Sequence, residues 1–191
     1  MFRKLKRPNV LTVLRIVLIV PLCLVFHSQQ VGALWASLGL LAVMGLTDLF
    51  DGYFARRYNV AHREGELMDS MADGFVRLSV FLLLLADHLI PLWMVLVVMW
   101  RDLVSWSLRF MDLARGRDEV HKRISGKING LIQSVAIGGI LIALLWAASV
   151  NHPINLGVVQ ILMLAAVGTA LWSTLDLLYT HKQAVKAFLR R

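Results

Sequence analysis

Four aspartates stand close together in an otherwise apolar part of the sequence. Asp48 and Asp51 are three residues apart, and Asp69 and Asp73 are four apart. At these spacings the two side chains of each pair share one face of a helix. A charged carboxylate at the centre of a membrane helix costs about 2.5–3.5 kcal/mol, so four of them need a positively charged partner. A bound divalent cation is the partner that the sequence indicates.

The two aspartate pairs lie on successive helices joined by the short segment 57–64, so the helices are antiparallel and the two faces can converge. A site made only of carboxylate oxygens favours Mg²⁺ or Mn²⁺ over zinc or copper. Four carboxylates can hold two such ions, and a closely spaced pair of ions suits the chemistry of a diphosphate. The six histidines form no pair at i,i+4 and the single cysteine is Cys23, which argues against zinc.

Each of these residues also has a structural interpretation. The aspartates could cap helices or pair with Arg56, Arg63 and Arg77. Gly52, Ala55 and Gly65 could let a ligand approach the backbone or could serve helix packing. Arg56 could hold a phosphate or anchor the helix end at lipid headgroups.

The composition places these carboxylates in a membrane protein. Hydrophobic residues make up 58% of the chain and charged residues only 17%, which lies outside the range of soluble domains. The prediction is one all-α domain over residues 1–191, a polytopic membrane protein with six transmembrane helices and a short N-terminal interfacial segment at 1–7. The six apolar runs are 9–27, 31–55, 66–87, 90–112, 125–149 and 154–179.

The basic residues that give the net charge of +8 cluster at one side of these helices. Nearly all of the Lys and Arg residues lie in the N-terminus, in 56–63, in 109–127 and in the C-terminal tail, whereas 27–30, 87–91 and 150–153 contain no Lys or Arg. The positive-inside rule then places both termini and the aspartates on the cytoplasmic side, just below the membrane surface. Attraction to anionic lipid headgroups accounts for the basic charge, and nucleic acid binding is not indicated.

The run Asp48-x2-Asp51-Gly52-x2-Ala55-Arg56-x8-Gly65-x3-Asp69-x3-Asp73 resembles, without a gap or substitution, the signature of the CDP-alcohol phosphotransferase family. The resemblance implies a six-helix membrane enzyme, usually a homodimer. Such an enzyme moves a phosphatidyl-type group from a CDP-linked donor to an alcohol and releases CMP. It also implies that Asp48, Asp51, Asp69 and Asp73 bind the metal ions and that Asp73 is the base for the acceptor hydroxyl. The implied CDP-binding residues are Asp48, Gly52, Ala55, Arg56, Gly65 and Asp69.

Within this family the chain most resembles the bacterial phosphatidylglycerophosphate synthases, through residues 8–15 and through Ser125-Gly126-Lys127 with Gln133. The implied donor is CDP-diacylglycerol, the implied acceptor is glycerol 3-phosphate, and the implied location is the bacterial cytoplasmic membrane. Two departures concern the acceptor. Gly74 stands where those synthases commonly have a lysine, and Arg101-Asp102 replaces their usual Arg-Glu, so inositol phosphate or another polar alcohol is an alternative acceptor.

Arg77 and Arg101 lie within apolar runs, where an isolated cation is costly. Arg77 and Arg101, with Lys127, are predicted to form a pocket for the phosphate of the acceptor. The alternative is that the arginines pair with aspartates or with a neighbouring helix.

A protein of a different class, a divalent-cation transporter, would also use carboxylates in membrane helices. A transport pathway requires polar residues across the whole membrane, whereas these carboxylates stay near one face. An inactive structural protein would not need every signature position to be filled. The sequence therefore favours the enzyme.

Overall fold

The computed structural model describes residues 7–57, 63–114 and 124–180, which form six α-helices and no β-strand. The helices are α1 (Arg7–Val25), α2 (Val31–Arg57), α3 (Arg63–Ala86), α4 (Leu92–Ala114), α5 (Ile124–Ser149) and α6 (Leu156–Thr180). The side chains of 7–11, 48–57, 63, 64 and 66 lie outside the described part. The predicted all-α fold of six helices is confirmed, and the largest boundary difference is at α3, which begins at Arg63 rather than at 66. The predicted interfacial segment falls almost entirely outside the described residues.

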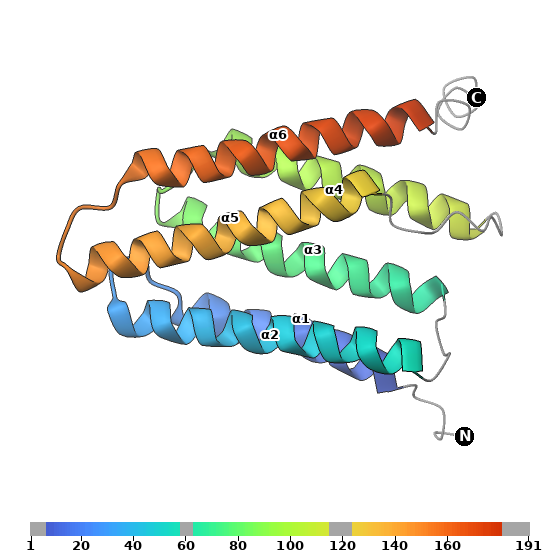
Figure 1. Cartoon of the computed structure of the whole chain (residues 1–191), viewed down its shortest axis with the longest axis horizontal. Helices are drawn as coiled ribbons and strands as arrows, with labels where there is room; N and C mark the ends of the chain where they lie inside the picture. Colours follow the sequence, from blue (N-terminus) through green and yellow to red (C-terminus); the bar gives the residue numbers. More distant parts are fainter. Residues whose placement is uncertain (1–6, 58–62, 115–123, 181–191) are drawn as a thin grey trace.

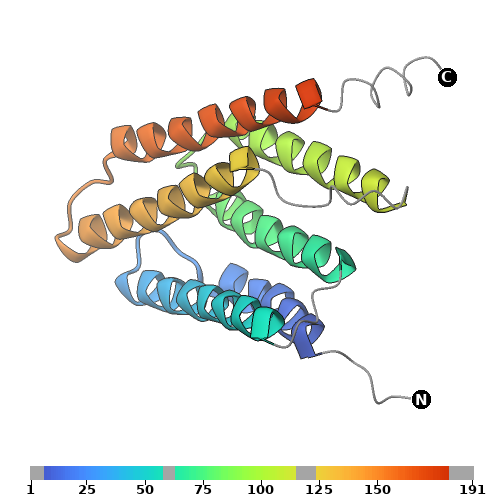
Figure 2. The same ribbon diagram turned by 45° about the vertical axis from the view of Figure 1, so that its right-hand side comes forward.

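The six helices run lengthwise beside one another and alternate in direction (Figure 1). Helices α1 and α2 form an antiparallel pair on one side of α3, and α4 and α6 lie on its other side, as the turned view in Figure 2 also shows. Helix α5 packs along α6 and also contacts α2 and α3. Helix α3, which carries Asp69 and Asp73, therefore contacts α1, α4 and α5.

Sharp turns at one end of the bundle reverse the chain after α1, α3 and α5. His88 has a φ of 56°, and the N–H of Leu89 donates to the carbonyl of Leu84 at 2.9 Å. This is the Schellman arrangement, in which a left-handed residue ends a helix and satisfies one of its last carbonyls. The same arrangement ends α5, where Asn151 has a φ of 51°.

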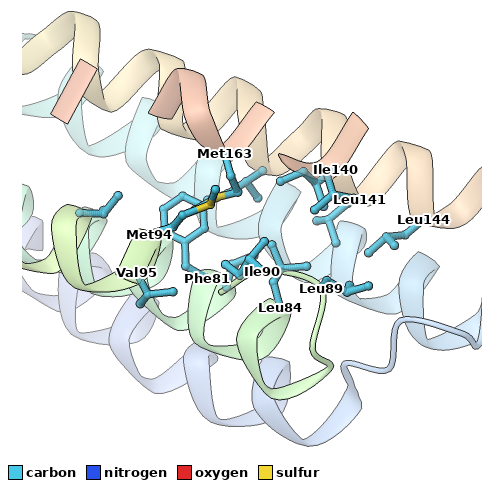
Figure 3. Close-up of a cluster of buried hydrophobic side chains, with 14 of the residues drawn as sticks. Phe81, Leu84, Leu89, Ile90, Met94, Val95, Ile140, Leu141, Leu144 and Met163 are labelled. Atoms are coloured by element: carbon cyan, nitrogen blue, oxygen red, sulfur yellow. The ribbon is translucent and has the colours of Figure 1, made fainter. Parts of the chain in front are cut away.

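The interior near these turns is apolar, and we call this half of the bundle the apolar end. Figure 3 shows side chains from α3, α4, α5 and α6 that meet there. Phe81, Leu84, Ile140, Leu144 and Met163 are all fully buried. These groups pack closely together, and among the described residues of the apolar end the buried polar side chains are the small hydroxyls of Ser28 and Ser37.

The interior at the opposite half, which we call the polar end, contains charged and hydrogen-bonding side chains. Here α1, α3 and α5 begin and α2, α4 and α6 end (Figure 1). The buried polar residues of this half come from four helices: Thr12, Arg15, Arg101, Asp102, Ser105, Arg109, Asp112, Ser125, Asn129, Gln133, Ser173 and Thr174. Because buried polar groups need partners, this half is where a polar ligand fits best.

The outer surface of the bundle exposes many large apolar side chains. Leu24, Trp35, Leu131, Ile161 and Leu175 are each more than 60% exposed, which is unusual for a protein surrounded by water. Among the described residues, α5 and α6 are long and apolar enough to cross a membrane. Apolar side chains thus cover the outside of the bundle, and polar side chains fill the interior of its polar end. These findings support a membrane protein.

Candidate active site

Two of the four predicted metal ligands lie within the described side chains, and both contact the same arginine. Asp69 and Asp73 are one turn apart on α3, and Arg15 reaches them from α1. The Arg15 Nη1 donates to Asp69 Oδ1 at 3.1 Å and also to Asp73 Oδ1. The predicted shared face of Asp69 and Asp73 is thus confirmed, and it points toward α1.

The exposures of the three side chains differ strongly. The Arg15 side chain is 2% exposed, whereas those of Asp69 and Asp73 are 37% and 23% exposed. A buried guanidinium is stable only where anions surround it, and the two carboxylates supply that charge. Part of each carboxylate remains accessible from outside the bundle, which a ligand-binding group requires.

The other half of the predicted site belongs to the last part of α2. Asp48, Asp51, Gly52, Ala55 and Arg56 all lie within this helix, at the polar end of the bundle. Their side chains lie outside the described residues, so convergence of the four aspartates stays a prediction. In the part of the chain whose side chains are described, no group of three or more His, Cys, Asp or Glu could hold a metal.

The described half of the site has the donor chemistry that a hard divalent cation needs. Its two carboxylates offer only oxygen ligands and lie on one helical face. Both contact the same positively charged group, the guanidinium of Arg15. Such oxygen donors match Mg²⁺ and Mn²⁺. Gly65, two turns before Asp73 and half-buried, lies on the same helix.

One turn deeper than Asp73, a polar network links α3 to α5 and α6. The Arg77 Nε donates to Gln133 Oε1 at 2.9 Å, and Gln133 Nε2 donates to Asn129 Oδ1 at 3.3 Å. The Thr169 hydroxyl also donates to Asn129 Oδ1, at 3.2 Å. Arg77 therefore pairs with an amide of α5 rather than with an aspartate, and Gln133 fixes the direction of its guanidinium.

Arg101 is held by its own neighbour and by α6. Its Nη1 donates to Asp102 Oδ1 at 2.7 Å, and its Nη2 and Nε donate to the Ser173 hydroxyl at 2.9 and 3.3 Å. The structure thus shows the alternative interpretation of Arg101, pairing with Asp102 and a neighbouring helix. Lys127, in the first turn of α5, is exposed. The three predicted acceptor-binding residues consequently lie on three helices with separate surroundings.

Gly74 follows Asp73 and faces α4. A Cβ at this position would overlap the indole of Trp106, and it would lie 3.4 Å from Asp102 Oδ2. The Trp106 ring in turn packs against Phe75 with a centroid separation of 5.1 Å. The space that a side chain at position 74 would enter is therefore filled by an aromatic residue.

Further polar contacts fix the ends of α3, α5 and α6. The Ser125 hydroxyl donates to Asp176 Oδ2 at 2.6 Å, which joins the start of α5 to the end of α6. The Arg109 Nη1 donates to the Ser70 hydroxyl at 3.1 Å, which joins α4 to α3 beside Asp69. Asp176, to which the sequence assigned no role, is thus part of a link between helices.

The sequence interpretation missed one residue of this site, Arg15. Its signal was present, because Arg15 lies within the apolar run 9–27, where an isolated cation needs an anionic partner. The sequence could not show which carboxylate would be that partner, since this depends on α1 lying beside α3.

Comparisons with known proteins identify the family. The model of the CDP-alcohol phosphatidyltransferase family matches residues 5–172. A protein of Yersinia pestis (strain Pestoides F) is 33% identical over 175 residues, which are 89% of this chain and 91% of that protein. A protein of Escherichia coli (strain K12) is 31% identical over 175 residues, which are 90% of this chain and 92% of that protein. Both relatives are named CDP-diacylglycerol–glycerol-3-phosphate 3-phosphatidyltransferase. With its signature, its six helices and these matches, the chain belongs to the CDP-alcohol phosphatidyltransferase family.

Proposed function

We propose that this protein transfers a phosphatidyl group from CDP-diacylglycerol to glycerol 3-phosphate and releases CMP. The observation that carries the proposal is the match to relatives of that name over about nine tenths of both chains. The geometry supports it, because Asp69 and Asp73 share one partly exposed face at the polar end of the bundle. A lipid-linked donor and a water-soluble acceptor can both reach such a place.

Four aspartates would hold the metal ions of this reaction. Asp69 and Asp73 on α3 would do so with Asp48 and Asp51 from the end of α2. Mg²⁺ or Mn²⁺, as two ions, would supply positive charge that stabilises the diphosphate and the departing CMP. The donor's cytidine diphosphate would lie against Asp48, Gly52, Ala55, Arg56, Gly65 and Asp69.

Asp73 would act on the acceptor. Its carboxylate would orient the hydroxyl of glycerol 3-phosphate and accept its proton as the new P–O bond forms and the bond to CMP breaks. The side chain is 23% exposed, so a hydroxyl group can approach it. The arrangement requires no group of the protein to be phosphorylated.

The phosphate of the acceptor would be bound by Arg77 and Lys127, because the guanidinium of Arg101 is already held by Asp102 and Ser173. Arg77 lies one turn beyond Asp73 on α3, so a phosphate bound there would hold the acceptor hydroxyl near Asp73. Gln133 uses only the Nε of Arg77, which leaves its two terminal nitrogens for the bidentate contact that guanidinium groups make with phosphate.

The cellular setting follows from the same features. We infer six transmembrane helices in the bacterial cytoplasmic membrane, with both termini and the active site on the cytoplasmic side, and a homodimer as the assembly. The described helices contain between 19 and 27 residues, which is enough to cross a hydrocarbon layer about 30 Å thick. The polar interior lies at the end to which the basic segments are attached.

The test is release of CMP from CDP-diacylglycerol by the purified protein with Mg²⁺ or Mn²⁺. Glycerol 3-phosphate, inositol 1-phosphate, inositol and serine are supplied one at a time. We expect release only with glycerol 3-phosphate. We also expect a loss of at least about 100-fold in Asp69→Asn and Asp73→Asn, since each removes a charged ligand of the metal site.

Asp87→Asn is the matched control. Asp87 lies at the apolar end, where Oδ2 accepts the N–H of Ser28 at 2.9 Å, and an asparagine oxygen can accept the same bond. We expect this variant to keep its activity. CMP release with inositol 1-phosphate and with no other acceptor would show that the proposed acceptor is wrong and that the proposed chemistry is right. If the folded protein in lipid released no CMP with any acceptor, the proposal would be contradicted.

A further inference from the structure

Arg15 is a buried cation placed on the carboxylates that the proposed function assigns to metal binding. It comes from α1, whereas every residue of the family signature lies in 48–73. A single nitrogen, Nη1, donates to one oxygen of Asp69 and one of Asp73. The guanidinium therefore stands between the two carboxylates, where a shared cation would also be held.

We propose that Arg15 is an exchangeable counterion of the metal site: its guanidinium neutralises Asp69 and Asp73 in the metal-free protein and leaves these oxygens when a divalent cation binds. The proposal rests on the proposed function, because that function assigns the two aspartates to metal ions. It adds a residue of α1 to the site and gives it a role that none of the signature residues has.

Exchange rather than shared binding follows from charge. A guanidinium and a divalent cation that contact the same carboxylate oxygens would lie within about 4–5 Å of each other, where two positive groups repel strongly in a poorly solvated site. Since Arg15 already compensates part of the negative potential around the two carboxylates, the metal must also compete with the arginine for them. Removing the arginine charge should therefore strengthen metal binding.

The displaced guanidinium still needs an anion, because the Arg15 side chain is only 2% exposed and an unpaired buried cation is costly. The diphosphate of a bound nucleotide supplies that charge at the same site. Metal and nucleotide binding then become coupled through Arg15, and each makes the other more favourable. Such coupling is reciprocal, so it can be measured from either ligand.

A merely structural role for Arg15 predicts a different result. If the arginine served only to hold α1 against α3 and to keep the carboxylates in place, its removal would loosen the site and weaken metal binding. The direction of the change in metal affinity thus separates an exchangeable counterion from a fixed support.

The experiment measures Mn²⁺ binding to the purified full chain in detergent by electron paramagnetic resonance, with and without cytidine diphosphate and with no lipid substrate. We expect Arg15→Gln to bind Mn²⁺ alone about tenfold more tightly than the wild type. We expect Arg15→Lys, which keeps the charge but lacks the planar fork, to lie between them. Addition of cytidine diphosphate should tighten Mn²⁺ binding at least about threefold less in Arg15→Gln than in the wild type, because the coupling group is gone.

Arg101→Gln is the matched control, since Arg101 is also a buried arginine of the polar end but pairs with Asp102 and Ser173 instead of the aspartates of α3. We expect its Mn²⁺ affinity to stay within about twofold of the wild type, because its carboxylate partner is not one of the proposed metal ligands. Size-exclusion chromatography identifies variants that do not fold, and Arg15→Lys decides the question if Arg15→Gln is among them.

Unchanged or weaker Mn²⁺ binding in the folded Arg15 variants, with normal binding by the wild type, would overturn this inference and leave the proposed function intact. If the wild type itself bound no Mn²⁺ but still released CMP, this inference and the metal assignment would both fail while the transfer reaction stood. A wild type that neither bound the ion nor released CMP would overturn the proposed function as well.

Discussion

At the scale of single residues, Gly74 is fixed by its neighbour on α4. A Cβ added to it would overlap the indole of Trp106, which is itself held against Phe75. In a helix interior alanine is normally more stable than glycine by about 0.5–1 kcal/mol. Forcing an extra methyl group into a closely packed core, however, costs about 1–3 kcal/mol. We therefore expect Gly74→Ala to lower the stability of the protein, seen as a lower midpoint of thermal unfolding in detergent.

Gly39→Ala provides the control for this substitution. Gly39 also lies within a helix, α2, and a Cβ there would meet nothing within 4 Å, so its midpoint should stay the same or rise. The cost of Gly74→Ala should shrink when it is combined with Trp106→Leu, because the overlapping ring is gone. An equal cost in both backgrounds would show that Trp106 is not the cause.

The sequence predicted the residues of the site better than their partners. Asp69 and Asp73 share a face because they are four apart on one helix, and that spacing is visible in the sequence. Arg101 pairs with the adjacent Asp102, which was one of the alternatives from the sequence, but the further partners of Arg77 and Arg101 are Gln133 on α5 and Ser173 on α6. Neither could be predicted, because the choice depends on which helices lie side by side and on the rotation of each about its axis.

At the scale of the helices, α4 and α6 are joined through one buried serine. The Ser173 hydroxyl accepts from both Nε and Nη2 of Arg101, and the arginine is 5% exposed. Ser173→Ala would leave those two donors without their acceptor, and hydrogen bonds to charged groups contribute about 1.5–3 kcal/mol. We expect a loss of stability of that order, measured by thermal unfolding.

Ser37→Ala is the matched control. Ser37 is also fully buried, but its hydroxyl donates at 2.8 Å to the carbonyl of Ala33 in its own helix, so no charged group loses a partner. We expect a clearly smaller effect than at Ser173. Equal effects at the two serines would mean that the link between α4 and α6 contributes little.

The helices themselves could be predicted because each needs only a long apolar run. Their pairing could not, since α1, α5 and α6 present apolar residues on several sides. The short segment 57–64 does predict that α2 and α3 are antiparallel. Nothing in the sequence places α1 beside α3 as well as beside α2, yet that contact brings Arg15 to the aspartates.

At the scale of the whole molecule, the bundle has a polar end and an apolar end, and the proposed topology turns the polar end toward the cytoplasm. Cysteine labelling tests this in a Cys23→Ser background. Gln29→Cys lies at the apolar end and Ala114→Cys at the polar end, and both positions are exposed. In cells with an intact cytoplasmic membrane, a membrane-impermeant maleimide should label the first but not the second, which should react only after permeabilisation. The reverse pattern would contradict the topology.

The same division of the interior argues against a pathway for ions through the bundle. Polar side chains occupy the polar end, but at the apolar end Phe81, Leu84, Ile140, Leu144 and Met163 are fully buried against one another (Figure 3). Moving a hydrated divalent cation through such a core would require it to lose its water without any replacing ligand. We therefore expect proteoliposomes to take up Mn²⁺ no faster than protein-free vesicles, as followed by quenching of an enclosed fluorescent chelator.

An ionophore added at the end of each trace shows that the enclosed dye responds to Mn²⁺. Asp69→Asn serves as the matched variant, because a transporter that uses the carboxylates would lose its flux when one of them is neutralised. If the wild type took up Mn²⁺ and Asp69→Asn did not, the aspartates would be part of an ion pathway. That result would contradict our expectation that the apolar end is closed to ions. We expect the wild type and Asp69→Asn to show the same background uptake of Mn²⁺, and only the wild type to release CMP. This is the outcome that the apolar core of the apolar end predicts.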